Sequence, residues 1–291
     1  MYLRPFGLRE LPFSLTPDPA FFFAHQGAQA ALNTLLVSLR SGEGFVKIVA
    51  EVGCGKTLLC RRLIAALAPD YETAYIPNPA MDARSMLLAV CEELEIEVDA
   101  AEIAHRLVKQ LKRCLLDRAR AGRSVVLIID EAQCIPDETV EALRLMSNIE
   151  TEKRKLLQIV LFGQPELDEK LAQPHLRQLL QRITFADQID PMRAEDVGAY
   201  VKFRLRAAGA TDDAIFNDAA IVELTRRSSG IPRIVNVIAH KSLMLAFGEG
   251  AATVTGVHVA LAADDTAALR NDRWRGPWLA RLLGRRRIGT S

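Results

Sequence analysis

The feature that most constrains the fold is a strand, a glycine-containing loop and a helix in direct succession. Residues 45–49, FVKIV, form a short β-branched apolar run bounded by glycine, which predicts a buried strand. In the helical pattern of residues 57–67, Leu59, Leu63 and Leu67 recur four positions apart and share one face. A buried strand that continues through a loop into a helix is the start of a βαβ unit, so we expect a parallel sheet.

The same alternation continues along the chain. Residues 124–130, SVVLIID, are almost uniformly apolar until the final aspartate, as in a central strand covered on both faces. Further strands are expected at 73–77, 156–163 and 182–189, and further helices at 84–94, 101–119 and 137–149. This order predicts the α/β class, with a doubly wound parallel sheet flanked by helices.

The pattern changes after Pro191. Three helical segments follow, at 193–208, 217–228 and 231–247, separated by glycines and without a convincing strand. We therefore expect a second, all-helical domain. The predicted organisation is an α/β domain with an N-terminal leader over 1–190, a small helical domain over 191–268, and a basic tryptophan-containing tail over 269–291.

Composition describes an ordinary globular protein, with 49% hydrophobic and 25% charged residues among 291. The five cysteines have neither metal-ligand spacing nor a disulfide framework, which favours a reducing cytoplasm. Charges and a proline occupy the place of a signal-peptide core, and no run of about 18 apolar residues occurs. We expect a cytoplasmic protein that does not span the membrane.

The net charge of +1 conceals an asymmetry. Residues 270–291 carry seven arginines and one aspartate, so the rest of the chain is net acidic and lacks the basic footprint of a strong nucleic-acid binder. Trp274 and Trp278 lie among these arginines. Peripheral contact with an anionic membrane, contact with nucleic-acid phosphates and a merely solubilising end all stay open for this tail.

The loop Ala50–Thr57, AEVGCGKT, has the spacing of a phosphate cradle, although alanine replaces the first glycine. Such a cradle needs inward backbone N–H groups, a helix N-terminus, a lysine for the β- and γ-phosphate oxygens and a hydroxyl for Mg²⁺. Alanine fits the first position if its φ is negative. The alternative is a glycine loop that only joins a strand to a helix. The expected contacts are Ala50, Glu51, Val52, Gly53, Cys54, Gly55, Lys56, Thr57 and Leu58.

Residues 125–133, VVLIIDEAQ, are the second element of the expected site. Asp130 ends a buried strand, at the edge where parallel sheets bind ligands, and would hold Mg²⁺ together with Thr57. Glu131 is placed to polarise a water molecule as a general base. Alone, such an acidic pair is often only a helix cap. Cys54, inside the loop, is expected to be a small filler, or a reactive thiol if it is exposed.

Taken in order, five segments resemble the extended AAA (AAA+) ATPases of the bacterial type that includes general secretion pathway protein A. They are FVKIVAEVGCGKT, VVLIIDEAQ, LFGQPEL, LLQRI and SGIPRIVN. The leader MYLRPFGLRELPFSLTPDPAFFF matches that type too, and the resemblance covers residues 1–265. AALNTLLVSLRSGEGFVKI, GKTLLCRRL and YIPNP are most similar to the ATPases of mannose-sensitive haemagglutinin (type IV) pilus biogenesis. The resemblance implies a P-loop NTPase sheet followed by a helical lid.

It also implies ATP and Mg²⁺ as cofactors, and roles at matching positions. Gln164 would sense the γ-phosphate or orient the water, and Lys56 and Glu131 would act in hydrolysis. Arg182 would be an arginine finger that reaches a neighbouring subunit of a homo-oligomer, with Arg177 as the competing candidate. Arg233 resembles the second sensor, carried by the lid. The plainer interpretation of Gln164 is a turn residue, and that of the three arginines is solvated surface side chains.

Three functions follow from these features. The first is an ATPase that converts ATP to ADP and phosphate and assists assembly of a type IV pilus or type II secretion apparatus, with its assembly proteins at the inner membrane as partners. The second is a DNA-associated helper of the transposition type, and the third is a scaffold that binds ATP without turnover. The leader and YIPNP favour the first, whereas intact Lys56, Asp130 and Glu131 argue against the scaffold.

Overall fold

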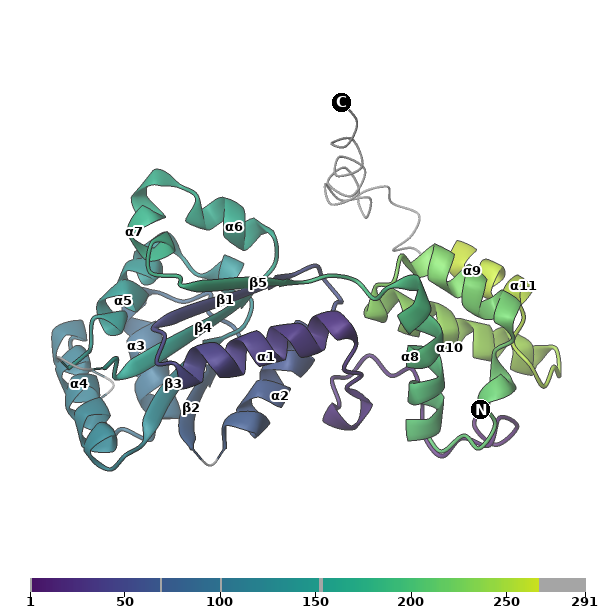
Figure 1. Ribbon diagram of the computed structural model, residues 1–291, viewed down its shortest axis with the longest axis horizontal. Coiled ribbons are helices and arrows are strands. Elements are labelled where there is room, and N and C mark those ends of the chain that lie inside the picture. Colours follow the sequence, from purple (N-terminus) through teal and green to yellow (C-terminus); the bar gives the residue numbers. More distant parts are fainter. Residues whose placement is uncertain (1, 69, 100, 152–153, 267–291) are drawn as a thin grey trace. The chain divides into compact units, whose positions relative to one another are not determined.

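The computed structural model describes residues 2–68, 70–99, 101–151 and 154–266 (Figure 1). The chain divides into two compact units. One runs from Pro17 to Met192, and the other combines the residues up to Thr16 with the chain from Arg193 onward.

A parallel sheet forms the centre of the unit from Pro17 to Met192. Within the described residues it has five strands in the order β2-β3-β4-β1-β5. The strands are β1 (Phe45–Ala50), β2 (Tyr71–Ile76), β3 (Ser124–Ile129), β4 (Leu157–Gly163) and β5 (Phe185–Ile189). All residues of β1 and β4 are buried, as a sheet covered on both faces requires. The predicted α/β class with a parallel sheet is confirmed.

Helices cover both faces of this sheet (Figure 1). They are α1 (Gln26–Arg40), α2 (Lys56–Leu67), α3 (Ala83–Glu93), α4 (Ala104–Arg120), α5 (Asp137–Ser147), α6 (Glu166–Leu171) and α7 (Arg177–Leu180). The buried faces of α3 to α7 share one apolar core with alternate residues of β3 and β4, among them Leu127 and Ile159. Helix α1 contacts β5 and packs beside α2. Because the strands are parallel, the carboxyl ends of β1, β3 and β4 lie at one edge of the sheet.

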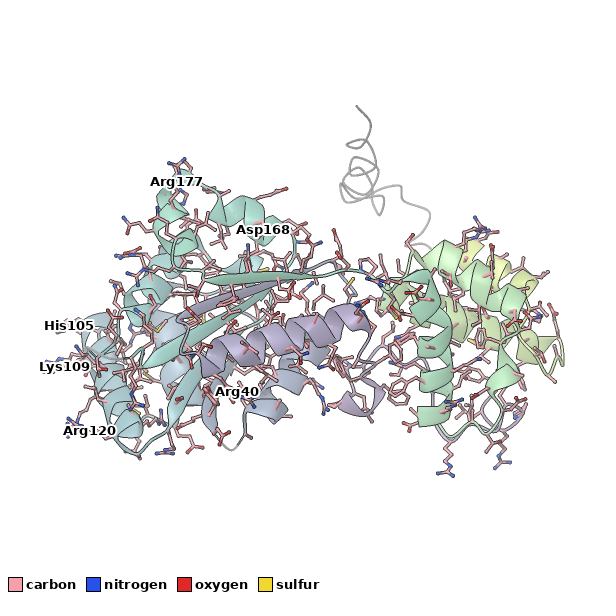
Figure 2. The ribbon with its side chains drawn as sticks, viewed as in Figure 1. Arg40, His105, Lys109, Arg120, Asp168 and Arg177 are labelled. Carbon is pink, nitrogen blue, oxygen red and sulfur yellow. The ribbon has the colours of Figure 1, made fainter. Side chains whose placement is uncertain are left out.

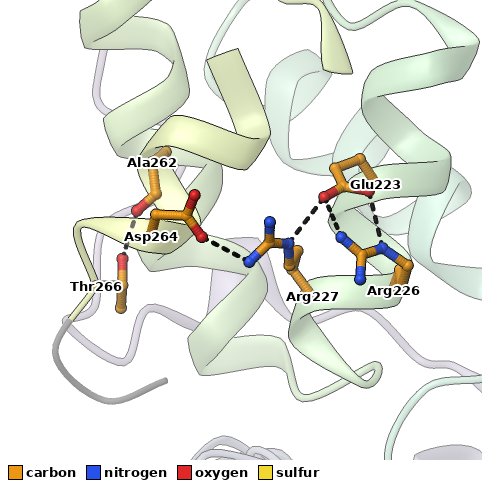
Figure 3. A network of polar contacts seen from close by, with 6 residues as sticks. All are labelled: Glu223, Arg226, Arg227, Ala262, Asp264 and Thr266. Atoms are coloured by element: carbon orange, nitrogen blue, oxygen red, sulfur yellow. Dashed lines mark hydrogen bonds and ion pairs between the residues drawn. The ribbon is translucent and has the colours of Figure 1, made fainter. Parts of the chain in front are cut away.

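The second unit is helical, as the change of pattern after Pro191 predicts. Its helices are α8 (Ala194–Ala207), α9 (Asp218–Ser228), α10 (Pro232–Gly248) and α11 (Gly256–Asp264). Left-handed Ser229 and Gly230 end α9, and Pro232 begins α10. Glu223 receives hydrogen bonds from Arg226 and Arg227, and Arg227 also reaches Asp264, which ties α9 to the end of α11 (Figure 3).

The division of the chain differs from the expected one at the N-terminus. The residues up to Thr16 group with the helical unit rather than with the sheet. The physical reason is a buried arginine: Arg204, 3% exposed, donates hydrogen bonds to the carbonyl oxygens of Pro12 and Ser14. The Tyr2 hydroxyl lies 2.7 Å from Nδ1 of His240. The leader is therefore an integral part of the helical unit.

Among the described residues, no helix combines the length and the apolar character needed to cross a bilayer. The basic tail predicted at 269–291, with Trp274 and Trp278, lies outside the described residues.

Candidate active site

The loop between β1 and α2 has the backbone of a cradle. Gly53 and Gly55 have φ of 85° and 90°, in the left-handed region that favours glycine. Ala50, at the end of β1, is fully buried and has no positive φ, so the condition under which alanine replaces glycine is met. Helix α2 begins at Lys56, and its first N–H groups therefore border the loop. This geometry suits an anion.

The other loop residues differ in exposure. Val52 is exposed, whereas Glu51 and Leu58 are half-buried. Cys54 is only 5% exposed, and burial raises the pKa of its thiol to about 12. The thiol is thus a buried, protonated filler, and the alternative of an exposed reactive cysteine does not hold.

Lys56 is a buried cation directed at its own loop. The side chain is 5% exposed, and Nζ donates hydrogen bonds to the carbonyl oxygens of Ala50 at 2.7 Å and Glu51 at 3.2 Å. Burial lowers the pKa of the Lys56 ammonium, and the negative charges of Glu131 and Asp130 oppose this shift. A poorly solvated ammonium beside inward N–H groups is well placed to bind phosphate oxygens.

Thr57 and Asp130 form the candidate metal site. The Thr57 hydroxyl donates to Oδ2 of Asp130 at 2.9 Å. Asp130 is 3% exposed, and burial raises its pKa, although hydrogen bonds from the Glu131 N–H and from Thr57 oppose this. A hydroxyl and a carboxylate are hard oxygen ligands of the kind that Mg²⁺ prefers. In the described ranges, no group of three His, Cys, Asp or Glu residues is placed to hold a metal ion.

Glu131 follows Asp130 with a left-handed backbone, φ 49° and ψ 40°. Its Oε2 accepts hydrogen bonds from Nε2 of Gln133 at 2.6 Å and from Nε2 of Gln164 at 2.8 Å. Burial by itself would raise the pKa of Glu131, but these bonds and the charge of Lys56 outweigh it and lower the pKa. An ionised carboxylate can accept a proton.

The structure brings most of the predicted residues together. Gln164 follows the end of β4, and it reaches Glu131 after β3 because these two strands are neighbours in the sheet. Two residues near the site had no predicted role: Gln133, and Tyr75 on β2, whose pKa is raised by burial and by the charge of Asp130. Gln133 lies inside the DEAQ segment, which was the available signal, whereas nothing in the sequence pairs Tyr75 with Asp130.

The predicted arginines come from separate segments of the chain. Arg182, just after α7, donates from Nη1 to the Ser147 hydroxyl at 2.9 Å, at the end of α5. Arg177 is exposed on α7 (Figure 2). Arg233 is the second residue of α10, in the helical unit, and is exposed. The roles assigned to these three arginines remain predictions.

Comparison with known proteins finds a family model that matches part of the chain. Residues 39–171 match the family model described as AAA domain. The chain is therefore similar to AAA domains over this range. It is also 39% identical over all 291 residues to general secretion pathway protein A of Aeromonas hydrophila. The match covers 53% of that protein, so the chain spans about half the length of this relative.

Solved structures share this fold at low identity. The ORC2 protein of Aeropyrum pernix, solved as ADPNP–ADP complexes, aligns with a TM-score of 0.63 and 17% identity over 87% of this chain and 71% of that one. Cdc6p of Pyrobaculum aerophilum gives 0.65 and 14% over 84% and 67%. The RuvB branch migration motor of Thermotoga maritima gives 0.55 and 18% over 91% and 73%. At such identities these likenesses show the fold alone.

Proposed function

We propose that the protein is an ATPase that converts ATP to ADP and phosphate and uses the cycle to assist assembly of a secretion or pilus apparatus. The observation that carries the proposal is the hydrogen bond between Thr57 and Asp130, which joins the first turn of α2 to the end of β3. Lys56 and Glu131 flank this bond. A cation, a hydroxyl and two carboxylates at one edge of a parallel sheet fit phosphoryl chemistry.

The loop and Lys56 bind the phosphates in this proposal. Backbone N–H groups from Glu51 to Leu58 surround the β-phosphate, and Nζ of Lys56 exchanges the Ala50 and Glu51 carbonyls for phosphate oxygens. Thr57 and Asp130 would hold Mg²⁺, which offsets charge on the phosphate oxygens when it is bound.

Glu131 accepts a proton from the attacking water, and Gln164 orients that water or senses the γ-phosphate. Support comes from the direct hydrogen bond between the two side chains at 2.8 Å and from the lowered pKa of Glu131. A positioned base of this kind contributes about 10² to 10⁴ in rate.

Conversion of hydrolysis into movement is assigned to arginines. Arg182, with Arg177 as the alternative, offsets developing charge in a neighbouring subunit of a homo-oligomer. Arg233 links the helical unit to the nucleotide as a second sensor. The position of Arg233 at the start of α10, in the helical unit, supports this assignment.

The cellular role is proposed from the 39% identity to general secretion pathway protein A. We propose action in type II secretion or type IV pilus biogenesis, the latter in a system of the mannose-sensitive haemagglutinin type. The protein would work in the cytoplasm at the inner membrane, with the assembly proteins as partners.

The test has a biochemical arm and a cellular arm. Purified protein is expected to release phosphate from ATP in a Mg²⁺-dependent manner, and tight binding without release would favour the scaffold. Stimulation by DNA rather than by secretion components would favour the DNA-associated helper. In the source bacterium, deletion should impair secretion or piliation, and the wild-type gene should restore it where Glu131→Gln does not.

A further inference from the structure

Three side chains close a ring of hydrogen bonds beside the candidate active site. Gln133 donates from Nε2 to Oε2 of Glu131 at 2.6 Å, and its Oε1 accepts the backbone N–H of Gln164 at 3.1 Å. Gln164 completes the ring with its own Nε2 on the same Glu131 oxygen at 2.8 Å. Gln133 therefore contacts both Glu131 and the backbone just after β4.

The chemistry of the partners admits one orientation of the Gln133 amide. An ionised carboxylate only accepts hydrogen bonds and a backbone N–H only donates, so the NH₂ group must face Glu131 and the oxygen must face Gln164. Flipping the amide would break both bonds. Both functions of this one side chain are thus used.

The surroundings leave room for Gln133 at this place. Gly163, the last residue of β4, lies next to it, and a Cβ on that glycine would come within 3.3 Å of Oε1 of Gln133 and 2.6 Å of Leu167. Glu131 has a left-handed backbone, which a non-glycine residue keeps only when neighbouring contacts hold it there. The bonds to its carboxylate, and that from the Cys134 N–H to its carbonyl at 2.8 Å, supply such contacts.

We propose that Gln133 is a positioning residue, which holds the Glu131 carboxylate and the Gln164 backbone in a fixed mutual arrangement for hydrolysis. The inference rests on the proposed ATPase function. Both amide donors meet Oε2, and Oε1 accepts no hydrogen bond from the part of the chain that the structure describes. Gln133 thereby directs Oε1 toward the attacking water, and it links any shift of Gln164 to the base.

Gln133→Met tests this, because methionine keeps the length of the side chain and removes both hydrogen bonds. The turnover number should fall at least about tenfold, while the dissociation constant for ATP stays within about twofold, since the hydrogen bonds of the Gln133 side chain go to Glu131 and Gln164. In a Glu131→Gln background, adding Gln133→Met should cost little further activity, because the residue acts through Glu131. An unchanged turnover number, or an equal loss in both backgrounds, would overturn the proposal.

Gln158→Met is the matched control. Gln158 is a buried glutamine on β4, the strand that leads to Gln164, and it donates to the carbonyl oxygens of Leu39 and Glu43, each at 2.9 Å. Its loss should lower the melting temperature and leave the ratio of turnover number to ATP affinity unchanged.

A measurement without ATP separates this inference from the ATPase proposal. Amide hydrogen exchange at Gln164 should become at least about tenfold faster in Gln133→Met and stay unchanged in Gln158→Met, because only Gln133 accepts that N–H. Wild-type protein that binds ATP without releasing phosphate would refute the proposed function. The exchange rate would still test the hydrogen bond between the Gln164 N–H and Gln133, and an unchanged rate at Gln164 would refute that bond.

Discussion

The hydroxyl of Thr57 donates to Oδ2 of Asp130 at 2.9 Å, across 73 positions of sequence. This bond joins the first turn of α2 to the end of β3, which is separated from β1 in the sheet only by β4. Because the strands are parallel, their carboxyl ends meet at one edge and present the loop, the carboxylates and Gln164 together. The predictions below test what that edge does.

Lys56→Ala should abolish tight nucleotide binding. Removing the buried ammonium deletes charged hydrogen bonds to phosphate, so we expect affinity for ATP to fall at least about a hundredfold. Titration with a fluorescent ATP analogue measures it. Lys109→Ala, on the exposed face of α4 (Figure 2), is the control and should bind like wild type. Retained affinity in Lys56→Ala would show that the loop is not a phosphate cradle.

Thr57→Val should remove the response to Mg²⁺. Valine has a similar shape but no oxygen, so the metal loses a ligand and Asp130 loses a hydrogen bond. Affinity for ATP, measured by calorimetry with Mg²⁺ and with a chelator, should become nearly equal in the variant. Thr139→Val is the control, since buried Thr139 donates to the Met81 carbonyl and should affect stability alone. A full Mg²⁺ effect in Thr57→Val would exclude the hydroxyl as a ligand.

Glu131→Gln should bind ATP and turn it over at least about a hundredfold more slowly, because an amide cannot accept the proton of water. Phosphate release and ATP affinity are measured on the same preparation. Glu138→Gln, an exposed residue of α5, should behave as wild type. Normal release by Glu131→Gln would assign the base to another residue.

Arg182→Ala and Arg177→Ala should differ in mixed assemblies. Arg182 is bonded to Ser147 of its own chain, whereas Arg177 is exposed, so a finger at Arg182 must first break that bond. If Arg182 acts on a neighbour, wild-type subunits mixed with the variant should lose hydrolysis in proportion to the variant fraction. If only Arg177→Ala lowered hydrolysis in the mixtures, Arg177 would be the arginine finger. A fully active monomer would refute both assignments.

Glu223→Gln should destabilise the helical unit in a pH-dependent way. Hydrogen bonds from Arg226 and Arg227 lower the pKa of Glu223 to about 2, below the ordinary 4.5. The network therefore stabilises fully above about pH 4.5, and its contribution is lost as the pH falls toward 2. These groups are partly solvated, so the effect at neutral pH should be about 0.5–1 kcal/mol.

Thermal unfolding of the full chain at pH 7 and at successively lower pH measures this difference. Glu195→Gln is the control, because its contact with Arg193 joins two exposed side chains at 3.7 Å. A Glu223→Gln deficit that does not shrink with acidification would contradict the assignment.

Local pattern predicts all five strands of the described sheet and the helices α2 to α5 and α8 to α10, because buried parallel strands are short apolar runs with turn residues at their ends. It also placed Lys56, Thr57 and Asp130 at element boundaries. Local pattern does not predict α1, α6, α7 or α11. Helix α11, GVHVALAAD, is short and alanine-rich, and its packing against α9 and α10 stabilises it. No local pattern places the leader with the helical unit, because the hydrogen bonds from Arg204 to the carbonyl oxygens of Pro12 and Ser14 join residues far apart in the sequence.

The sequence by itself determined the order of the five strands and of the helices α2 to α5 and α8 to α10, the loop with its lysine and hydroxyl, and the carboxylates after the apolar strand. These are properties of neighbours along the chain, governed by side-chain periodicity and backbone freedom at glycine. Only the tertiary structure decided that Gln133 and Gln164 hold the same oxygen of Glu131, and that the leader belongs to the helical unit. Such contacts depend on which strands are adjacent and which side chains are buried together, and sequence spacing does not encode either directly.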